Sequence, residues 1–323
     1  MKRRALAALA LAALTAAPLT VLAQDTFPNR PVRFIVPYAP GGLPDTVARI
    51  VAQKLTERLG QPVVVENRPG GNGVVAFQSL MNSPNDSHSY IVSDGSMLSI
   101  TPQINKAATY QVGKELTAVS LIARSPLFLV AHPKTNVKSL DEFLTRVRAA
   151  PGNYTYGSSG IGSTHHLTME AMKSELKLDV RHVPFRGSGQ SVPALLGGQV
   201  DFLFSALPSM AGFVRNNQVT LIATNGPKRS PQAPDVAAIA EVIPGFDFSV
   251  TVGVIGRSGT SAEAVKRLSE EIAQVVKLPD VVERFQTAGI EPVGAGPDAY
   301  RREIERENQA MAKAGKAADL KAE

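Results

Sequence analysis

Short apolar segments recur along this chain of 323 residues, and most lead through a glycine-rich or polar turn into a helical pattern. The first segment is 32–36 (VRFIV), after which apolar side chains recur at helical spacing over 45–59. Segments 63–65 and 90–92 repeat the strand pattern, with a helix predicted over 74–81 between them. This alternation indicates an α/β fold, in which parallel strands form a sheet and helices cover both of its faces.

The same alternation returns in the second half of the chain. The predicted strands are 154–156, 180–183, 200–204 and 221–223, and the predicted helices are 141–149, 163–176 and 191–196. A chain of this length is expected to form about two domains. We predict two lobes, each a mainly parallel sheet flanked by helices, with a ligand cleft between them. Lobe 1 comprises 24–124 plus 248–323, and lobe 2 comprises 125–247.

The chain is expected to pass between the lobes at 123–128 and at 245–252, a layout that suits hinge closure around a ligand. Helices predicted at 261–277, 281–288 and 297–313 are expected to pack on lobe 1. The tail 310–323 is rich in alanine and lysine and lacks an apolar stripe, so we expect it to fray.

The N-terminus has the pattern of a secretory signal peptide. Three basic residues precede an apolar stretch, and a small-x-small site predicts cleavage after Ala23, so 1–23 is the expected signal peptide and the periplasm the expected location. A mitochondrial presequence is the alternative.

The chain has no cysteine, which excludes a disulfide and a lipid-modified cysteine. The chain has a net charge of +6, and three of its positive charges lie in the predicted signal peptide. The net charge of the rest of the chain is therefore small and does not indicate a nucleic acid as a partner.

The turn at 37–45 (PYAPGGLPD) joins a predicted buried strand to a helix. A helix start carries unpaired N–H groups and about half a positive charge, so it can bind an anion, and glycine allows a ligand to approach the backbone closely. The alternative is an ordinary tight turn with Pro44 at the helix start. The candidate ligand-binding residues here are Tyr38, Ala39, Gly41, Gly42, Leu43 and Asp45.

A second turn of this kind is 157–163 (GSSGIGS). It does not match the dinucleotide fingerprint, the phosphate-binding loop or the nucleophile elbow, which leaves a serine-rich anion site of hydroxyl and N–H donors. Ser163 could instead serve only as a helix N-cap. The candidate ligand-binding residues here are Ser158, Ser159, Gly160, Gly162 and Ser163. Two such turns predict that each lobe holds one end of an acidic small molecule.

Further candidates come from strand ends and histidines. Ser93 and Ser205 follow predicted strands at the edge where α/β sheets bind ligands, and Asp201 opens a strand, where it could bond the cleft backbone or end the loop.

His166 either lines the cleft or is a structural histidine. His165 and His166 point about 100° apart on a helix, which disfavours a shared metal. We find no set of nucleophile, base and orienting residue, and predict no catalytic residue, no metal and no cofactor.

Five segments together resemble one known family. They are FPNRPVRFIVPYAPGGLPDTVAR, LGQPVVVENRPGGNG, AAPGNYTYGSSGIGSTHHL, HVPFRGSGQSVPALLGGQVDFLF and PDVAAIAEVIPGFDF. Their order and spacing are similar to those of the Bug-type (TctC-like) periplasmic receptors of tripartite tricarboxylate transporters. The resemblance implies a two-lobed periplasmic-binding-protein (class II) fold. It also implies a small carboxylate held by the backbone at 41–43, with Asp45 beside it, and by the serine-rich turn at 158–163.

The chain departs from the family pattern at 85–90 (NDSHSY) and at 108–112 (ATYQV), which leaves the identity of the ligand open. The resemblance implies a solute-binding receptor, not an enzyme. We expect it to act as a monomer that captures a small organic acid: a mono-, di- or tricarboxylate, an aromatic acid or an acidic amino acid. Subunits of a membrane transporter are the expected partners. A membrane sensor kinase is the alternative partner, and a periplasmic enzyme on the same scaffold is the less favoured alternative function.

Overall fold

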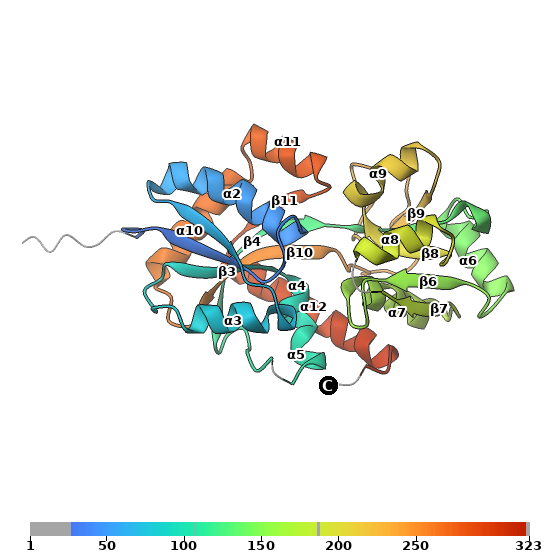
Figure 1. The fold of residues 1–323 in the computed structure, drawn as a ribbon, viewed down its shortest axis with the longest axis horizontal. Coiled ribbons are helices and arrows are strands. Elements are labelled where there is room, and N and C mark those ends of the chain that lie inside the picture. Colours follow the sequence, from blue (N-terminus) through green and yellow to red (C-terminus); the bar gives the residue numbers. More distant parts are fainter. Residues whose placement is uncertain (1–26, 107, 186–187, 321–323) are drawn as a thin grey trace, which may run out of the picture.

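The computed structural model describes residues 27–106, 108–185 and 188–320, and they form two lobes, each built around its own sheet (Figure 1). The predicted signal peptide 1–23 lies outside the described residues. The first sheet has the strand order β11-β4-β10-β3-β1-β2, and the second has the order β7-β6-β8-β5-β9.

The first sheet combines a parallel half with an antiparallel half. Its strands are β1 Val32–Val36, β2 Val63–Asn67, β3 Ser89–Asp94, β4 Leu116–Ser125, β10 Val250–Arg257 and β11 Glu291–Ala295. Strand β1 pairs in parallel with β2 and β3, as the alternating pattern predicts. Strands β10 and β11 pair antiparallel with their neighbours. The sheet is therefore mixed: β10, which returns from the second lobe, and β11 run against the other four strands.

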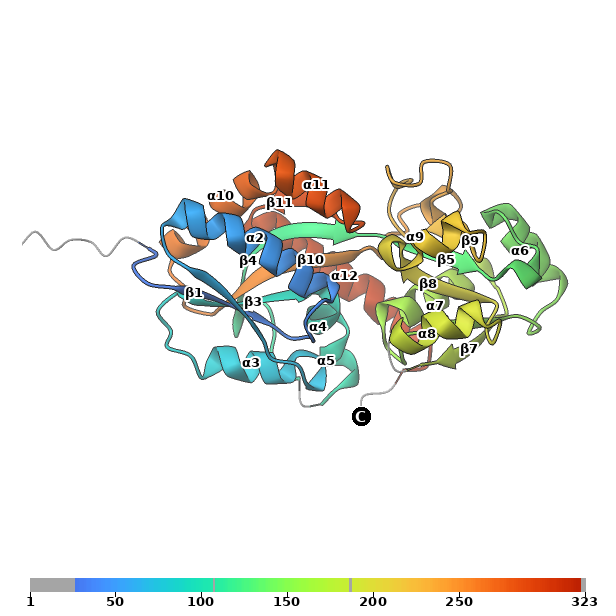
Figure 2. The same cartoon turned by 45° about the horizontal axis from the view of Figure 1, so that its top comes forward.

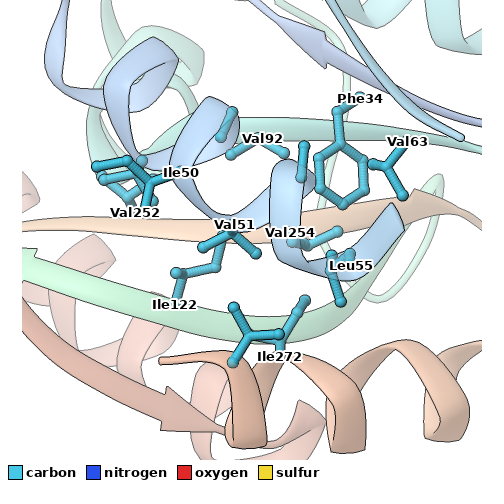
Figure 3. Close-up of a cluster of buried hydrophobic side chains, with 14 of the residues drawn as sticks. Phe34, Ile50, Val51, Leu55, Val63, Val92, Ile122, Val252, Val254 and Ile272 are labelled. Carbon is cyan, nitrogen blue, oxygen red and sulfur yellow. The ribbon is translucent and has the colours of Figure 1, made fainter. Parts of the chain in front are cut away.

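Helices cover both faces of this sheet. On one face lie α2 Leu43–Leu59, α10 Ala262–Val275 and α11 Pro279–Thr287, and on the other lie α3 Val74–Met81, α4 Gly95–Ser99, α5 Thr101–Ile104 and the first part of α12 Pro297–Ala317. Helix α2 buries Val51 and Leu55 against Phe34 of the sheet and Ile272 of α10 (Figure 3). Gly60 ends α2 in the left-handed conformation, at φ 68°.

The second lobe repeats the layered plan on a smaller scale. Its strands are β5 Leu127–Ala131, β6 Thr155–Ser158, β7 Arg181–Pro184, β8 Phe202–Ala206 and β9 Thr220–Thr224, and its helices are α6 Leu140–Ala149, α7 Thr164–Leu176, α8 Ser188–Leu196 and α9 Leu207–Arg215. Strand β6 pairs in parallel with β7 and β8, whereas β5 pairs antiparallel with β8 and β9. Among the described residues, short 3₁₀ segments also occur at Gly71–Gly73, Pro133–Thr135 and Ile239–Glu241.

In the described part of the chain, two strand connections cross between the lobes, in addition to helix α12. Strand β4 passes into β5 with only Pro126 between them, and the return crossing leads through Phe248 and Ser249 into β10. A polar network lies at the return crossing: Arg124 pairs with Asp247 and with Glu303, each at 2.8 Å. Arg306 pairs with the same two acids. The network ties both crossing segments to helix α12.

Helix α12 bridges the two lobes, and the prediction that the tail frays from residue 310 is wrong for its helical part. Tyr300 and Ile304 pack on the first sheet, while Met311 and Ala314 are buried in the core of the second lobe. Lys313 also pairs with Glu175 of α7. The buried residues of this stretch are Met311 and Ala314, with half-buried alanines beside them, so the sequence shows little apolar periodicity there.

Candidate functional site

The two glycine-rich turns lie at the sheet edges next to the crossings. In the first lobe, Val252 near the start of β10 pairs with Asp94 at the end of β3, and β1 runs parallel to β3. In the second lobe, Leu127 at the start of β5 pairs with Ala206 at the end of β8, and β6 runs parallel to β8. Both turns therefore follow strands that end on the side of the hinge. Figure 2 shows α2 beginning on the side of the first lobe that faces the second.

The first turn is held in shape by the helix that it enters. Gly41 has a φ of 85°, which favours glycine, and its N–H donates a 2.9 Å hydrogen bond to Oδ2 of Asp45. Arg49 and Asn67 also donate to the Asp45 carboxylate, which is buried. The structure thus places Asp45 as an acceptor inside the turn. Within the described residues, the N–H groups of Gly42 and Leu43 meet no acceptor, which leaves them available to an anion.

The charge of Asp45 is stabilised by these contacts. Burial acts to raise the pKa of Asp45, but the hydrogen bonds from Arg49, Gly41 and Asn67 outweigh burial and hold the pKa below its ordinary value. The ionised carboxylate therefore persists at neutral pH beside a predicted anion site. Its charge is offset by Arg49, whose guanidinium lies 3.0 Å away.

Tyr38 joins this turn to the end of β3. Its hydroxyl donates to Oδ1 of Asp94 at 2.6 Å and lies 3.1 Å from Oγ of Ser96. Asp94 also caps helix α4 by accepting from the N–H of Ser96. Burial raises the pKa of Asp94 and, with the Asp94 charge, raises that of Tyr38. Ser93, one residue earlier, has its side chain fully buried inside the sheet.

The second turn is ordered by its own serines. Ser158 is buried and accepts from the N–H of Gly160 at 3.1 Å, and Ser163 caps α7 by accepting from the N–H of His166 at 3.2 Å. Ser163 also donates to the carbonyl of Gly160 at 2.7 Å. The hydroxyls of Ser158 and Ser163 are thus engaged in shaping the turn. Ser159 contacts Ser188 at 3.2 Å and remains the more accessible hydroxyl.

His166 lies behind the turn rather than at its surface. It is 5% exposed, accepts from the N–H of Gly162 at 3.1 Å through Nδ1, and stacks on His182. Gly162 itself has a φ of 76° and touches the other lobe, since a Cβ placed there would lie 2.6 Å from Cδ1 of Ile104. Ile161, at the tip of the turn, is 65% exposed. The second turn therefore meets the first lobe at α5.

The two remaining candidates, Ser205 and Asp201, lie at opposite ends of strand β8 in the second sheet. Ser205 pairs with Phe128 near the hinge and is buried. Asp201 precedes β8 at the far edge, where it accepts from the N–H and the hydroxyl of Thr155, both at 2.8 Å. A strand of four to five residues, each rising about 3.3 Å, separates that edge from the glycine-rich turn. The structure therefore gives Asp201 a role in ending the loop and not at the turn.

The sequence matches the tripartite tricarboxylate transporter family receptor (TctC) over residues 47–317, which is most of the chain. The chain belongs to the TctC family. Protein BugT of Bordetella pertussis is 33% identical to it over 311 residues, which cover 96% of this chain and 95% of BugT. These matches confirm the resemblance that the five sequence segments carry.

Solved structures of TctC-like proteins share the fold. One is Rpa4515 of R. palustris with adipate, which is 28% identical, has a TM-score of 0.79, and covers 92% of this chain and 100% of its own. Another is MatC from Rhodopseudomonas palustris with bound malate, also 28% identical, with a TM-score of 0.73 and coverage of 89% and 99%. The predicted two-lobed periplasmic-binding-protein fold is confirmed. TctC proteins are solute-binding receptors rather than enzymes.

Several features of this TctC chain lie beyond what the sequence indicated. Asp94 was foreseen only as part of a strand end, although its Asp-x-Ser spacing to Ser96 is typical of a helix cap. The contact of His182 with Ser158 joins residues 24 apart and has no local signal. In the described part of the chain, no cluster of His, Asp or Glu suits a metal ion, and no helix is long and apolar enough to span a bilayer.

Proposed function

We propose that the protein captures a small organic acid in the periplasm, holds it between the two glycine-rich turns and delivers it to a tripartite transporter in the membrane. The observation that carries this proposal is the placement of both turns at the hinge side of their sheets, one from each lobe. Each turn begins a helix, and an oriented set of N–H groups at a helix start stabilises a carboxylate.

We infer that the ligand has two acidic ends. Two anion sites on separate lobes suit a dicarboxylate, and the structures of Rpa4515 with adipate and MatC with malate, each 28% identical to this chain, hold ligands of that class. The N–H groups of Gly42 and Leu43 would bind one carboxylate. The hydroxyl of Ser159 and those N–H groups of the second turn that are not bonded within the turn would bind the other. Water exclusion on closure strengthens such charged hydrogen bonds.

The lobes proposed to close on the ligand are 24–124 plus 248–323 and 125–247, with residues 1–23 as the signal peptide. Closure would bend the chain at Pro126 and at 248–249, where the strands of the two sheets meet. Support for this hinge comes from the network of Arg124, Asp247 and Glu303, which lies at the return crossing. Because α12 contacts both lobes, its second half must slide or tilt with the second lobe.

The proposed function is tested by placing a side chain in the first turn. Gly42 has a φ of −74°, and only the carbonyl of Ala39, at 3.6 Å, lies near a Cβ placed there, so Gly42→Val is expected to fold normally. The valine side chain would cover the free N–H groups and abolish binding of adipate and malate, as measured by calorimetry. Gly212→Val on exposed α9, where nothing lies within 4 Å of a Cβ, is the matched control and should bind normally. Unchanged affinity in Gly42→Val would refute the assignment of the first turn.

A further inference from the structure

Two stacked histidines lie directly behind the second glycine-rich turn. The imidazole rings of His166 on α7 and His182 on β7 have centroids 4.1 Å apart and planes within 17° of each other. Tyr156 of β6 stacks on His182, with ring centroids 4.8 Å apart. The role of His166 could not be decided from the sequence, and the proposed ligand contacts use neither histidine.

Each ring is bonded to the turn by a specific atom. The backbone N–H of Gly162 donates to Nδ1 of His166 at 3.1 Å. Since an N–H can only donate, Nδ1 must carry a lone pair, and the ring proton of a neutral His166 sits on Nε2. Nε2 of His182 lies 2.7 Å from Oγ of Ser158, which accepts from the N–H of Gly160. The pair of rings thus holds both positive-φ glycines of the turn, one directly and one through a serine.

The surroundings of the pair contain few charged groups. Glu170 accepts from the hydroxyl of Tyr156 and pairs with Lys173 at 2.6 Å, and Lys173 also lies over the Tyr156 ring. From the other side of α7, helix α12 contributes Met311 and Ala314 to an apolar core, and its Lys313 is paired with Glu175. The carboxylate that faces the pair is therefore already matched by a lysine.

We propose that His166 is a positioning residue of the ligand site in the second lobe: its neutral imidazole fixes the N–H of Gly162, and protonation of the stacked pair releases the turn and weakens ligand binding. This inference rests on the proposed function. A proton on Nδ1 of His166 would make this atom a donor, so it would face the N–H of Gly162 with no acceptor between them. A second positive ring only 4.1 Å away adds repulsion.

The protonation equilibria of both rings favour the neutral pair near pH 7. Desolvation lowers the pKa of His166, and desolvation followed by the His166 charge lowers the pKa of His182 to about 4. The bonded arrangement is therefore complete above the ordinary histidine pKa of about 6.5 and is lost as the pH falls toward the lowered values.

Three substitutions at His166 separate positioning from packing. Asparagine places an acceptor near the position of Nδ1, whereas glutamine places one near Nε2, and phenylalanine keeps the ring without an acceptor. With adipate and malate as probes, we expect His166→Asn to bind within about threefold of the wild type. We expect His166→Gln and His166→Phe to bind at least about tenfold more weakly, the equivalent of one lost bond. Gly212→Val on α9, where nothing lies within 4 Å of a Cβ, is the control and should bind normally.

A second measurement tests the hydrogen bond between Gly162 and His166 in the absence of ligand. In protein labelled with ¹⁵N, His166 should show an unprotonated Nδ1, and the amide of Gly162 should exchange slowly in the wild type and in His166→Asn but rapidly in His166→Phe. The carboxylic acids themselves take up protons near pH 4, so pH profiles of affinity are compared with those of His166→Asn. We expect the wild type to lose more affinity than His166→Asn between pH 7 and pH 4.

The outcomes are distinguishable. If the wild type binds no carboxylate, the proposed function fails, while the ¹⁵N measurement still judges the bond between His166 and Gly162. If the wild type binds and His166→Phe binds equally well, with Gly162 exchange unchanged, the positioning role is refuted and the proposed function stands. Equal loss of affinity in His166→Asn and His166→Phe would also refute it, because it would indicate a packing role alone.

Discussion

The N–H of Gly41 donates a 2.9 Å hydrogen bond to the carboxylate of Asp45, four residues further along the chain. The second glycine-rich turn repeats this spacing, since the N–H of Gly162 donates to Nδ1 of His166. In each lobe one N–H of the turn is therefore bonded to a side chain of the helix that follows. This internal bond holds each turn in shape, and in the first turn it leaves the N–H groups of Gly42 and Leu43 without an acceptor among the described residues.

Asp45 should contribute to stability only while it is ionised. The pKa of the folded state lies below the unfolded value of about 3.9, so the stabilisation is complete above that value and is lost as the pH falls through the lowered pKa. We expect Asp45→Ala to lower the free energy of unfolding by about 1–3 kcal/mol at pH 7, measured by urea denaturation. The difference from the wild type should shrink below pH 4, and a difference that does not depend on pH would contradict this account.

Ser159 and Ser163 should have different roles although they lie in one turn. Ser163 caps α7, so Ser163→Ala is expected to cost about 1 kcal/mol of stability. Ser159 is the accessible hydroxyl, so Ser159→Ala should leave the melting temperature unchanged and weaken the binding of adipate or malate. Calorimetric unfolding and binding titrations of both variants check this division. The reverse pattern, with Ser159→Ala unstable and fully able to bind, would contradict it.

Gly253 on β10 provides the space for Tyr300 of α12. A Cβ on Gly253 would lie 2.3 Å from Cζ of the buried Tyr300 ring. We expect Gly253→Ala to destabilise the protein by about 1–3 kcal/mol because neither the sheet nor the ring can move freely. Gly212→Ala on exposed α9 is the control and should be neutral or slightly stabilising. Equal unfolding midpoints for Gly253→Ala and the wild type would show that α12 is not packed as described.

Glu307 should make the protein less stable at alkaline pH. Burial raises its pKa to about 8, and Thr251 donates to Oε1 at 2.7 Å. Since the folded pKa lies above the unfolded value, folding takes up a proton, and stability falls as the pH rises from about 4.3 through 8. We expect Glu307→Gln to gain stability relative to the wild type over this range, measured by urea midpoints at pH 5, 7 and 9. A constant offset at all three pH values would contradict a buried neutral Glu307.

The sequence predicted those parts of the fold that have strong local patterns. Helix α2 and strand β1 have regular apolar spacing, and Gly60 is a typical helix end, so their positions agree with the structure. The helix was predicted to residue 313, but its packing on the second lobe was missed because Ala310 and Ala314 are small and give almost no apolar contrast, although Ala314 is buried. Whether a residue packs there depends on the partner helix α7 and not on its own hydrophobicity.

The candidate site was predictable at the level of the two turns but not of their internal bonds. Glycine density between strand and helix marks both turns locally, and the pairing of β3 with β10 then places the first at the hinge. Asp201 was recognised as the start of a strand, but its bonds to Thr155, 46 residues away, have no local pattern that could decide between bonding the cleft and ending the loop. The hydrogen bond between Arg124 and Asp247 joins residues 123 apart, so no local pattern could indicate it.

The central claim is that the two turns bind the two ends of an organic acid, and a thermal-shift screen of the protein lacking residues 1–23 tests it most directly. The chain has no tryptophan, so an external dye reports unfolding. A ligand that binds only the folded state must raise the melting temperature. We predict a concentration-dependent rise with at least one dicarboxylate, such as adipate or malate, and none with the corresponding diamide. Equal shifts with acid and diamide, or no shift with any acid, would contradict the account.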